Sequence, residues 1–321
     1  MSFNINSSIA KMKPPKDMRI ICIDITNKCD LACSNCTRLL ANQEHFWDMS
    51  EENFKNAVLS LKNFQGLVIM IGGNPCMHPK FFELCKIFQM HRPNKNTRGL
   101  WTNNFFKHEK ISIETFGVFN LNAHNDKRGV KSLKNFHNSK HYHGGSSSHA
   151  PILTAIKDLY EGREKEMWNL ISNCDVNKNW SASIVQNKGK LRAYFCEIAA
   201  SFDLARGEDH GLEVTENWWN NDINFYNKQI NHFCPGCGVA AKLSATLDSK
   251  ELDTYSISNK DLADLSVKIS GRSVRKINSL DEISRLSNDV TQYSDKTKKN
   301  LKHKIRNLIW KFKKISNSLF N

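Results

Sequence analysis

The 321-residue sequence lacks a run of about 18 consecutive apolar residues, the length that a membrane-spanning helix needs. Its first 16 residues also lack an apolar signal region, so we expect a chain that is not exported. With 40% hydrophobic residues and a mean hydropathy of −0.53, the composition is typical of a soluble globular protein. The length suits one large domain, or a large domain and a small one. We therefore expect a cytoplasmic protein.

Acidic residues are absent from 296–314, which contains nine Lys or Arg residues. The formal net charge is +14, so this segment accounts for most of it and leaves +5 for the remainder. We therefore expect no nucleic-acid partner for the core. Apolar residues at helical spacing over 297–319 predict a basic amphipathic helix. Such a helix can lie on an anionic membrane surface, dock a partner or pack on its own domain. Peripheral contact with the inner membrane is one hypothesis.

Ten cysteines in a chain without an export signal favour a reducing compartment and metal binding over disulfides. Three of them, Cys29, Cys33 and Cys36, form a CxxxCxxC loop directly after the apolar segment 18–26. A cube-shaped iron–sulfur cluster usually takes four cysteines, so a loop of three predicts one iron with an open position. A zinc site or a set of buried core thiols is the alternative, and the spacing after a strand favours the cluster.

Strand-like and helix-like segments alternate in the first 125 residues. Buried strands are expected at 18–26, 66–71, 99–102 and 117–123. Helices are expected after Ser50, a residue suited to an N-cap, and from Pro79 to Met90. This alternation predicts an α/β fold with a parallel sheet. The second strand ends in Gly72-Gly73-Asn74-Pro75, where glycines would let the backbone approach a ligand.

The CxxxCxxC loop and the Gly-Gly-Asn-Pro strand end resemble the motifs of radical S-adenosylmethionine (SAM) enzymes. The resemblance implies a partial TIM-like (β/α)6 barrel with chemistry at the carboxyl ends of its strands. It implies a [4Fe–4S] cluster on Cys29, Cys33 and Cys36, whose open iron is chelated by SAM. One electron, delivered by a reductase such as flavodoxin or ferredoxin, then cleaves SAM to a 5′-deoxyadenosyl radical. The family motifs assign contacts with SAM to Asn35, Gly72, Gly73, Asn74, Pro75, Thr102 and Asn103.

Two residues depart from the family pattern. Asn74 stands where the family normally has the glutamate of GGEP, which binds the amino group of SAM. The Asn carbonyl can accept a hydrogen bond, but the charge is lost. Asn35 stands where the family usually has an aromatic or apolar side chain near the adenine.

A second set of cysteines lies downstream: Cys174, Cys196, Cys234 and Cys237. A β-hairpin turning at Gly189 is expected between the first two, over 180–195. This arrangement resembles the twitch domain, a short form of the SPASM extension, in which four cysteines hold an auxiliary [4Fe–4S] cluster. Four thiolates leave no open iron, which implies electron transfer or a structural role. Zinc on the same four thiolates is the alternative.

Residues 125–150 are polar and contain His137, His141, His143 and His149, whose irregular spacing favours a solvated or substrate-covering loop over a metal site. Asn122, His124 and His149 are the candidate catalytic residues. His149 precedes an expected helix over 151–160, whose N-terminus would suit a phosphate on the substrate.

The predicted organisation is an arm (1–17), the barrel (18–173), a twitch-like α+β domain (174–245) and a helical extension (246–321). Because relatives with a twitch domain include dehydrogenases of aminocyclitols and sugars, the resemblance implies C–H chemistry on a carbohydrate-like small molecule, such as oxidation or epimerisation. One alternative is a peptide-modifying maturase. A rival from another class is a non-catalytic zinc- or cluster-binding interaction protein.

Overall fold

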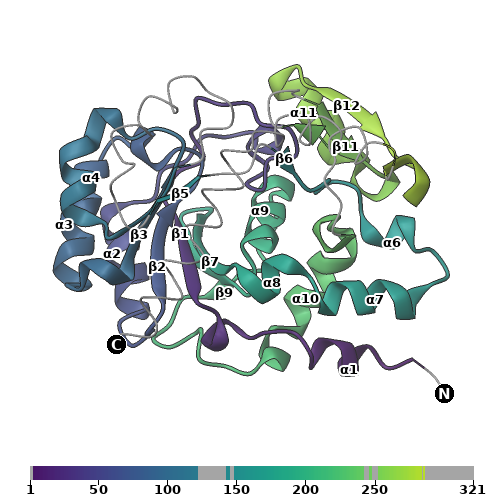
Figure 1. Cartoon of the computed structure of the whole chain (residues 1–321), viewed down its shortest axis with the longest axis horizontal. Helices are drawn as coiled ribbons and strands as arrows, with labels where there is room; N and C mark the ends of the chain where they lie inside the picture. The colour runs from purple at the N-terminus through teal and green to yellow at the C-terminus, as the bar shows by residue number, and fades with distance from the viewer. Residues whose placement is uncertain are drawn as a thin grey trace, which may run out of the picture.

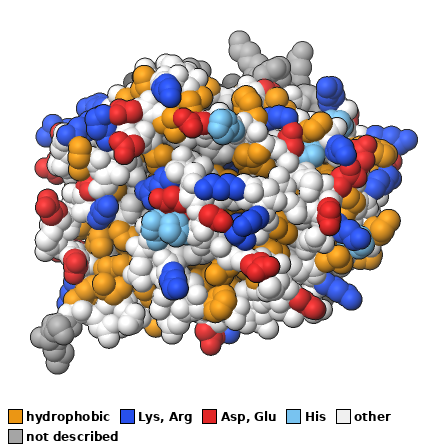
Figure 2. Space-filling view, turned by 180° about the vertical axis from the view of Figure 1, so that it is seen from behind, with side chains coloured by type: hydrophobic (Ala, Val, Ile, Leu, Met, Phe, Trp, Pro, Cys, Tyr) orange, Lys and Arg blue, Asp and Glu red, His pale blue; other side chains and the backbone are white. Residues whose placement is uncertain are grey.

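The computed structural model describes residues 3–121, 142–144, 148–241, 246–247, 252–283 and 285. Asn122, His124 and the basic segment 297–319 lie outside the described residues. Among those described, no helix is both long enough and apolar enough to cross a bilayer. Figure 2 shows one face of the molecule, on which basic and acidic side chains are interspersed among the described residues.

An eight-stranded sheet runs through the molecule in the order β5-β4-β3-β2-β1-β7-β8-β9 (Figure 1). The six strands from β5 to β7 are parallel, and β8 and β9 are antiparallel to their neighbours. The predicted α/β fold with a mostly parallel sheet is confirmed, and it is consistent with a partial TIM-like barrel. The strands are β1 (Ile20–Asp24), β2 (Leu67–Ile71), β3 (Arg98–Thr102), β4 (Val118–Leu121), β5 (Tyr142–Gly144), β7 (Ser181–Asn187), β8 (Lys190–Tyr194) and β9 (Leu212–Glu213).

Three helices alternate with the first four strands and lie together beside the sheet in Figure 1: α2 (Glu51–Ser60), α3 (Phe81–His91) and α4 (Glu109–Thr115). The predicted cap of α2 is confirmed, because the Ser50 hydroxyl accepts a hydrogen bond from the Asn53 N–H. Apolar side chains at helical spacing fill the core between helices and sheet. Phe54 of α2 meets Phe88 of α3 edge-to-face, with ring centroids 5.6 Å apart.

The hairpin expected over 180–195 is present as β7 and β8. Its two-residue turn is Lys188-Gly189, and both residues have positive φ angles of 48° and 79°. Such a turn matches the twist of the flanking strands. β7 pairs in parallel with β1, so the hairpin extends the main sheet across the expected domain boundary at residue 174. The division into domains therefore stays a prediction.

The segments before and after this hairpin in the chain are mainly helical. The buried face of α9 packs on β7, and Gly207 ends that helix with φ of 64°. The N-terminal arm contains α1 and lies beside α7. These helices are α1 (Ile5–Ile9), α6 (Ile156–Leu159), α7 (Glu164–Ser172), α8 (Asp175–Asn179), α9 (Glu197–Arg206) and α10 (Asn227–Phe233).

The segment 252–283 differs from the helical extension that the sequence predicts. It contains two parallel strands, β11 (Leu252–Tyr255) and β12 (Ser273–Lys276), connected by α11 (Lys260–Ser270). The strands are only four residues long and mix polar with apolar side chains, so their pattern is too short to reveal a strand. A further two-stranded pair joins β6 (Ser148–His149) to β10 (Thr246–Leu247).

Candidate functional site

The carboxyl ends of β1, β2 and β3 meet at one edge of the sheet, and the CxxxCxxC loop follows β1 at this edge. The end of β2 is hydrogen-bonded to the segment that enters the loop. Gly73 N–H donates to Thr26 O (2.9 Å), and Asn74 N–H donates to Lys28 O (2.7 Å). A Cβ atom on Gly73 would lie 2.2 Å from Lys28 O. The glycine therefore permits close contact between two backbone segments, whereas the sequence suggested an approach to a ligand.

Gly72 serves the same contact. Its φ of 145° is one that residues with a side chain rarely adopt, and a Cβ atom would lie 2.2 Å from Thr26 O. Pro75 is buried and begins a single turn of 3₁₀ helix over Pro75–Met77. The Gly-Gly-Asn-Pro motif thus fixes the position of the cysteine loop relative to β2.

Polar side chains from the loop, from β2 and from β3 form one hydrogen-bonded group. Asn74 Oδ1 accepts from Thr102 Oγ1 (2.8 Å) and from Cys76 N–H (3.1 Å). Asn74 Nδ2 and Asn103 Nδ2 both donate to Asp30 Oδ1, at 3.3 Å and 2.8 Å. The structure therefore brings together the predicted residues Asn74, Thr102 and Asn103. It adds Asp30, which the sequence analysis missed because its partners lie 44 and 73 residues away.

The side-chain carbonyl oxygen of Asn103 differs from the other polar atoms of this group in its hydrogen bonding. Asn103 is 8% exposed, and its side-chain Oδ1 atom is buried without a hydrogen-bond partner among the described residues. A buried acceptor without a donor costs free energy, so such an atom at a candidate site indicates a missing donor. The Asn74 carbonyl, in contrast, already accepts two hydrogen bonds.

The β11–α11–β12 unit holds the cysteine loop from the other side. Arg272 and Asp253 form an ion pair of 2.8 Å, with side chains 3% and 5% exposed. Arg272 also donates to the carbonyl of Cys33 (2.9 Å). Asn35 is buried. Its backbone N–H donates to Asp253 Oδ1 (2.6 Å), and its side-chain Oδ1 accepts from Thr254 N–H (3.2 Å). The Asn35 side chain therefore contacts this unit, where the family resemblance suggested a contact with adenine.

His149 also reaches the cysteine loop, because its Nδ1 atom lies 3.2 Å from the carbonyl oxygen of Ser34. The helix expected from residue 151 begins only at Ile156, and it is four residues long. His149 lies in β6 instead, paired with Thr246 of β10. The suggested phosphate site at a helix N-terminus beside His149 is therefore wrong.

The three thiols of the loop are half-buried. Burial raises the pKa of Cys29 to about 12, and it also raises the pKa of Cys36. Desolvation disfavours the thiolate in both cases. A cationic metal group that binds these sulfurs would reverse that preference.

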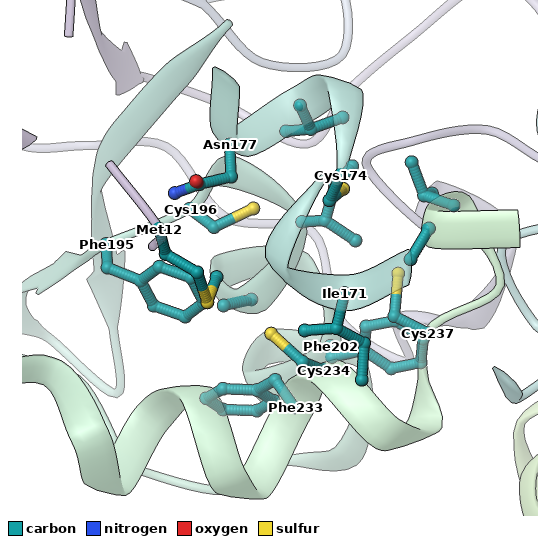
Figure 3. Close-up of a pocket in the computed structure, with 15 residues that line it drawn as sticks. Met12, Ile171, Cys174, Asn177, Phe195, Cys196, Phe202, Phe233, Cys234 and Cys237 are labelled. Carbon is teal, nitrogen blue, oxygen red and sulfur yellow. The ribbon is translucent and has the colours of Figure 1, made fainter. Parts of the chain in front are cut away.

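The second set of cysteines lines one cavity. Cys174, Cys196, Cys234 and Cys237 line a cavity of about 30 Å³, together with apolar side chains such as Met12 and Phe233. Figure 3 shows the four sulfur atoms around this space, at the ends of α7 and β8 and after α10. Burial raises the pKa of Cys237 to about 12, and the neighbouring Cys174 adds to the increase.

The spacing of these sulfurs is wider than a zinc site requires. Zinc holds sulfur at about 2.3 Å, which places tetrahedral ligands about 3.8 Å apart. Among the described residues, one group of three potential ligands has all its ligand atoms within 4.8 Å of one another: Glu208, His210 and His232. No three of the cysteine sulfurs meet that limit within this part of the chain.

A buried polar network joins the surroundings of the two cysteine sets. Arg38, two residues after Cys36, lies 2.8 Å from Asp24 and 3.0 Å from Glu197, which follows Cys196. Ser181 donates to the same Glu197 oxygen (2.7 Å). Both charged partners hold the pKa of Arg38 above its ordinary value, although burial alone would lower it. No sequence pattern signalled this network, because Arg38 and Glu197 are 159 residues apart.

The two cysteine sets lie toward opposite ends of the parallel strands β1 and β7. Cys29, Cys33 and Cys36 follow the carboxyl end of β1. Cys174 precedes the amino end of β7, which is parallel to β1, and Cys196 follows the antiparallel strand β8. The two sets therefore lie beyond opposite ends of the parallel strands β1 and β7.

No family model and no curated protein matches the sequence. Several solved structures match the fold at low sequence identity. BtrN in complex with AdoMet and 2-DOIA is 14% identical, with a TM-score of 0.46 over 68% of this chain and 92% of that chain. BtrN in an open conformation is 12% identical, with a TM-score of 0.40 over 68% and 86%. Streptococcus suis SuiB bound to S-adenosylmethionine is 12% identical, with a TM-score of 0.33 over 65% of each chain. These likenesses concern the fold.

Proposed function

We propose that the chain is a radical SAM enzyme whose catalytic [4Fe–4S] cluster is held by Cys29, Cys33 and Cys36. The observation that supports this most is the meeting of the cysteine loop with the ends of β2 and β3, where Asn103 keeps a buried carbonyl without a donor. When bound, the cluster supplies the electron that cleaves SAM to a 5′-deoxyadenosyl radical, which removes hydrogen from a C–H bond. The residues at this edge fit a ligand with hydrogen-bond donors.

The chain itself supplies binding and orientation. Gly72 and Gly73 fix the loop against β2, and Arg272 fixes the Cys33 carbonyl from the opposite side. Packing by the β11–α11–β12 unit limits the access of water to the backbone of residues 33–35. Holding the reacting groups in a fixed geometry and excluding water are the usual contributions of a protein to cofactor chemistry.

For the second set we propose an auxiliary [4Fe–4S] cluster on Cys174, Cys196, Cys234 and Cys237. The convergence of all four cysteines on one cavity supports a shared metal centre there, and the motif resemblance favours a cube over zinc. Four thiolate ligands would leave no position for SAM, so its role would be electron transfer or structural support.

The proposed substrate is a carbohydrate-like small molecule that undergoes oxidation, epimerisation or a related reaction. This proposal rests on the motif resemblance, as does the proposed reductase partner. His149 is the described candidate for a catalytic group, because it lies beside the cysteine loop. Asn122 and His124 stay predictions outside the described residues.

The experiment is anaerobic purification, metal analysis and incubation with dithionite and SAM, followed by chromatography for 5′-deoxyadenosine. We expect about eight irons per chain, since each of two cubes contains four. Cys33→Ala should abolish SAM cleavage. Cys85→Ala is the matched control, because Cys85 is a buried core thiol in α3 outside both sets.

A Cys234→Ala/Cys237→Ala variant separates the two sites. It should keep the SAM-dependent spectroscopic signal and lose about half of the iron. Zinc in place of iron in the wild-type chain, or no 5′-deoxyadenosine from an iron-loaded chain, would overturn the proposed enzyme and leave an interaction protein as the better account.

A further inference from the structure

The strand-2 motif of this chain has lost the carboxylate that the family uses for the amino group of SAM, and the structure shows a carboxylate nearby. We propose that Asp30, in the cysteine loop, supplies the missing negative charge and binds the SAM amino group together with the Asn103 carbonyl. This inference rests on the proposed function and identifies the residues of its SAM site.

The first step concerns Asn74. Its side-chain carbonyl accepts from Cys76 N–H and lies 2.8 Å from the Thr102 hydroxyl, whose single proton can also go to Asn104 O (3.0 Å). Its amide nitrogen donates to Asp30 Oδ1. Asn74 therefore positions Asp30 and carries no negative charge of its own, although it occupies the motif position.

The second step concerns the location of Asp30. Two amide groups, from the ends of β2 and β3, hold the same carboxylate oxygen at 3.3 Å and 2.8 Å. Asp30 directly follows Cys29, so the carboxylate lies beside a proposed iron ligand. The residue is exposed despite these bonds, which suits a group that faces an incoming ligand.

The third step concerns Asn103, which links Asp30 to the unsatisfied acceptor. Its amide nitrogen is bonded to Asp30, and its carbonyl oxygen is buried without a donor. An amino group whose nitrogen binds iron keeps two N–H donors. One can bond the Asp30 carboxylate, and the other can remove the cost of the buried Asn103 oxygen.

The test measures binding and uses a SAM analogue that lacks the α-amino group. Equilibrium dialysis against the reconstituted, unreduced protein gives both affinities without turnover. We expect wild-type protein to prefer SAM, and Asp30→Asn to lose about tenfold or more in SAM affinity while its affinity for the analogue stays the same. Asp264→Asn, an exposed aspartate in α11, is the matched control and should behave as wild type.

The outcomes separate the two proposals. A wild-type chain that carries the cluster but binds no SAM refutes the proposed function itself. A chain that binds SAM, with Asp30→Asn keeping the wild-type preference over the analogue, refutes only the role of Asp30. If Asp30→Asn retains less iron than wild type, Asn103→Ala decides in the same assay: loss of the preference supports the assignment, and an unchanged preference overturns it.

Discussion

Arg38 and Glu197 form a buried ion pair with an N–O distance of 3.0 Å, and each follows a cysteine of a different set. Arg38 lies two residues after Cys36, and Glu197 lies directly after Cys196. The pair therefore connects the loop at the carboxyl edge of the sheet to the start of α9. Buried charges of this kind are costly to separate, because one partner is left uncompensated in a medium of low polarity.

Replacing Arg38 with methionine should destabilise the protein strongly. The change leaves Asp24 and Glu197 buried without their cation, and removal of one partner from a buried pair typically costs about 3–5 kcal/mol. Denaturant unfolding of the purified chain measures the loss. Lys80→Met removes the exposed pair with Glu51 and should cost about 1 kcal/mol or less. Equal unfolding midpoints for the two variants would contradict the importance of the buried pair.

Gly73→Ala should displace the cysteine loop. The new Cβ atom would lie 2.2 Å from Lys28 O, which is a backbone atom and cannot move aside cheaply. We expect a loss of about 1–3 kcal/mol or more from overpacking, with reduced iron retention. Gly162→Ala is the control, since open space surrounds that position and only its positive φ of 70° causes strain. If Gly73→Ala retains wild-type iron and stability, the close contact is not required.

Arg272→Met should destabilise the β11–α11–β12 unit and weaken retention of the first cluster. The change removes the hydrogen bond to the Cys33 carbonyl and leaves Asp253 buried without its partner. Iron release to a chelator, followed by absorbance, should be faster than in wild type. Arg275→Met changes an exposed residue of β12 and should release iron at the wild-type rate. The prediction fails if both variants release iron equally.

His78 should make stability depend on pH below neutrality. Burial lowers its pKa from the ordinary value of 6.5, and its ring joins Met49 O (3.0 Å) to the Lys80 N–H (3.0 Å). The unfolded chain takes up a proton first as the pH falls below 6.5. The stabilisation is therefore complete above that value and is lost as the pH falls toward the lower pKa of the folded state.

Unfolding midpoints between pH 7.5 and 5 test this dependence. His78→Asn keeps an acceptor for the Lys80 N–H but has no proton to gain, so its stability should vary less with pH than that of wild type. His45→Asn, at an exposed position, should retain the wild-type dependence. A wild-type profile in His78→Asn would show that other groups cause the acid sensitivity.

Local patterns predicted the elements that depend on neighbouring residues. The apolar segments 18–26 and 66–71 contain β1 and β2, Ser50 caps α2, and Gly189 lies in the hairpin turn. Each of these depends on periodicity or turn chemistry within about ten residues. The sequence also groups the four downstream cysteines as one set, and the structure places them around one cavity.

Contacts between distant segments were not predictable in the same way. The resemblance places Asn35 near adenine, and the structure adds contacts with Asp253 and Thr254, more than 200 residues away, that no local pattern indicates. The roles of Gly72 and Gly73 depend on the path of the backbone at Thr26 and Lys28, which no single strand pattern describes. The position of Asp30 is not predictable from its neighbours in the sequence, because its carboxylate is held by two asparagines at the ends of other strands.

The parallel pairing of β7 with β1 has a consequence for the two segments that bear the cysteine sets. The five residues of β1 span about 13 Å between their first and last Cα atoms, at about 3.3 Å per residue. Backbone hydrogen bonds fix the register of the two strands, so the strand ends from which these segments depart are held relative to each other. A slip of one residue would shift those ends by about 3.3 Å and turn every side chain of the strand to the other face.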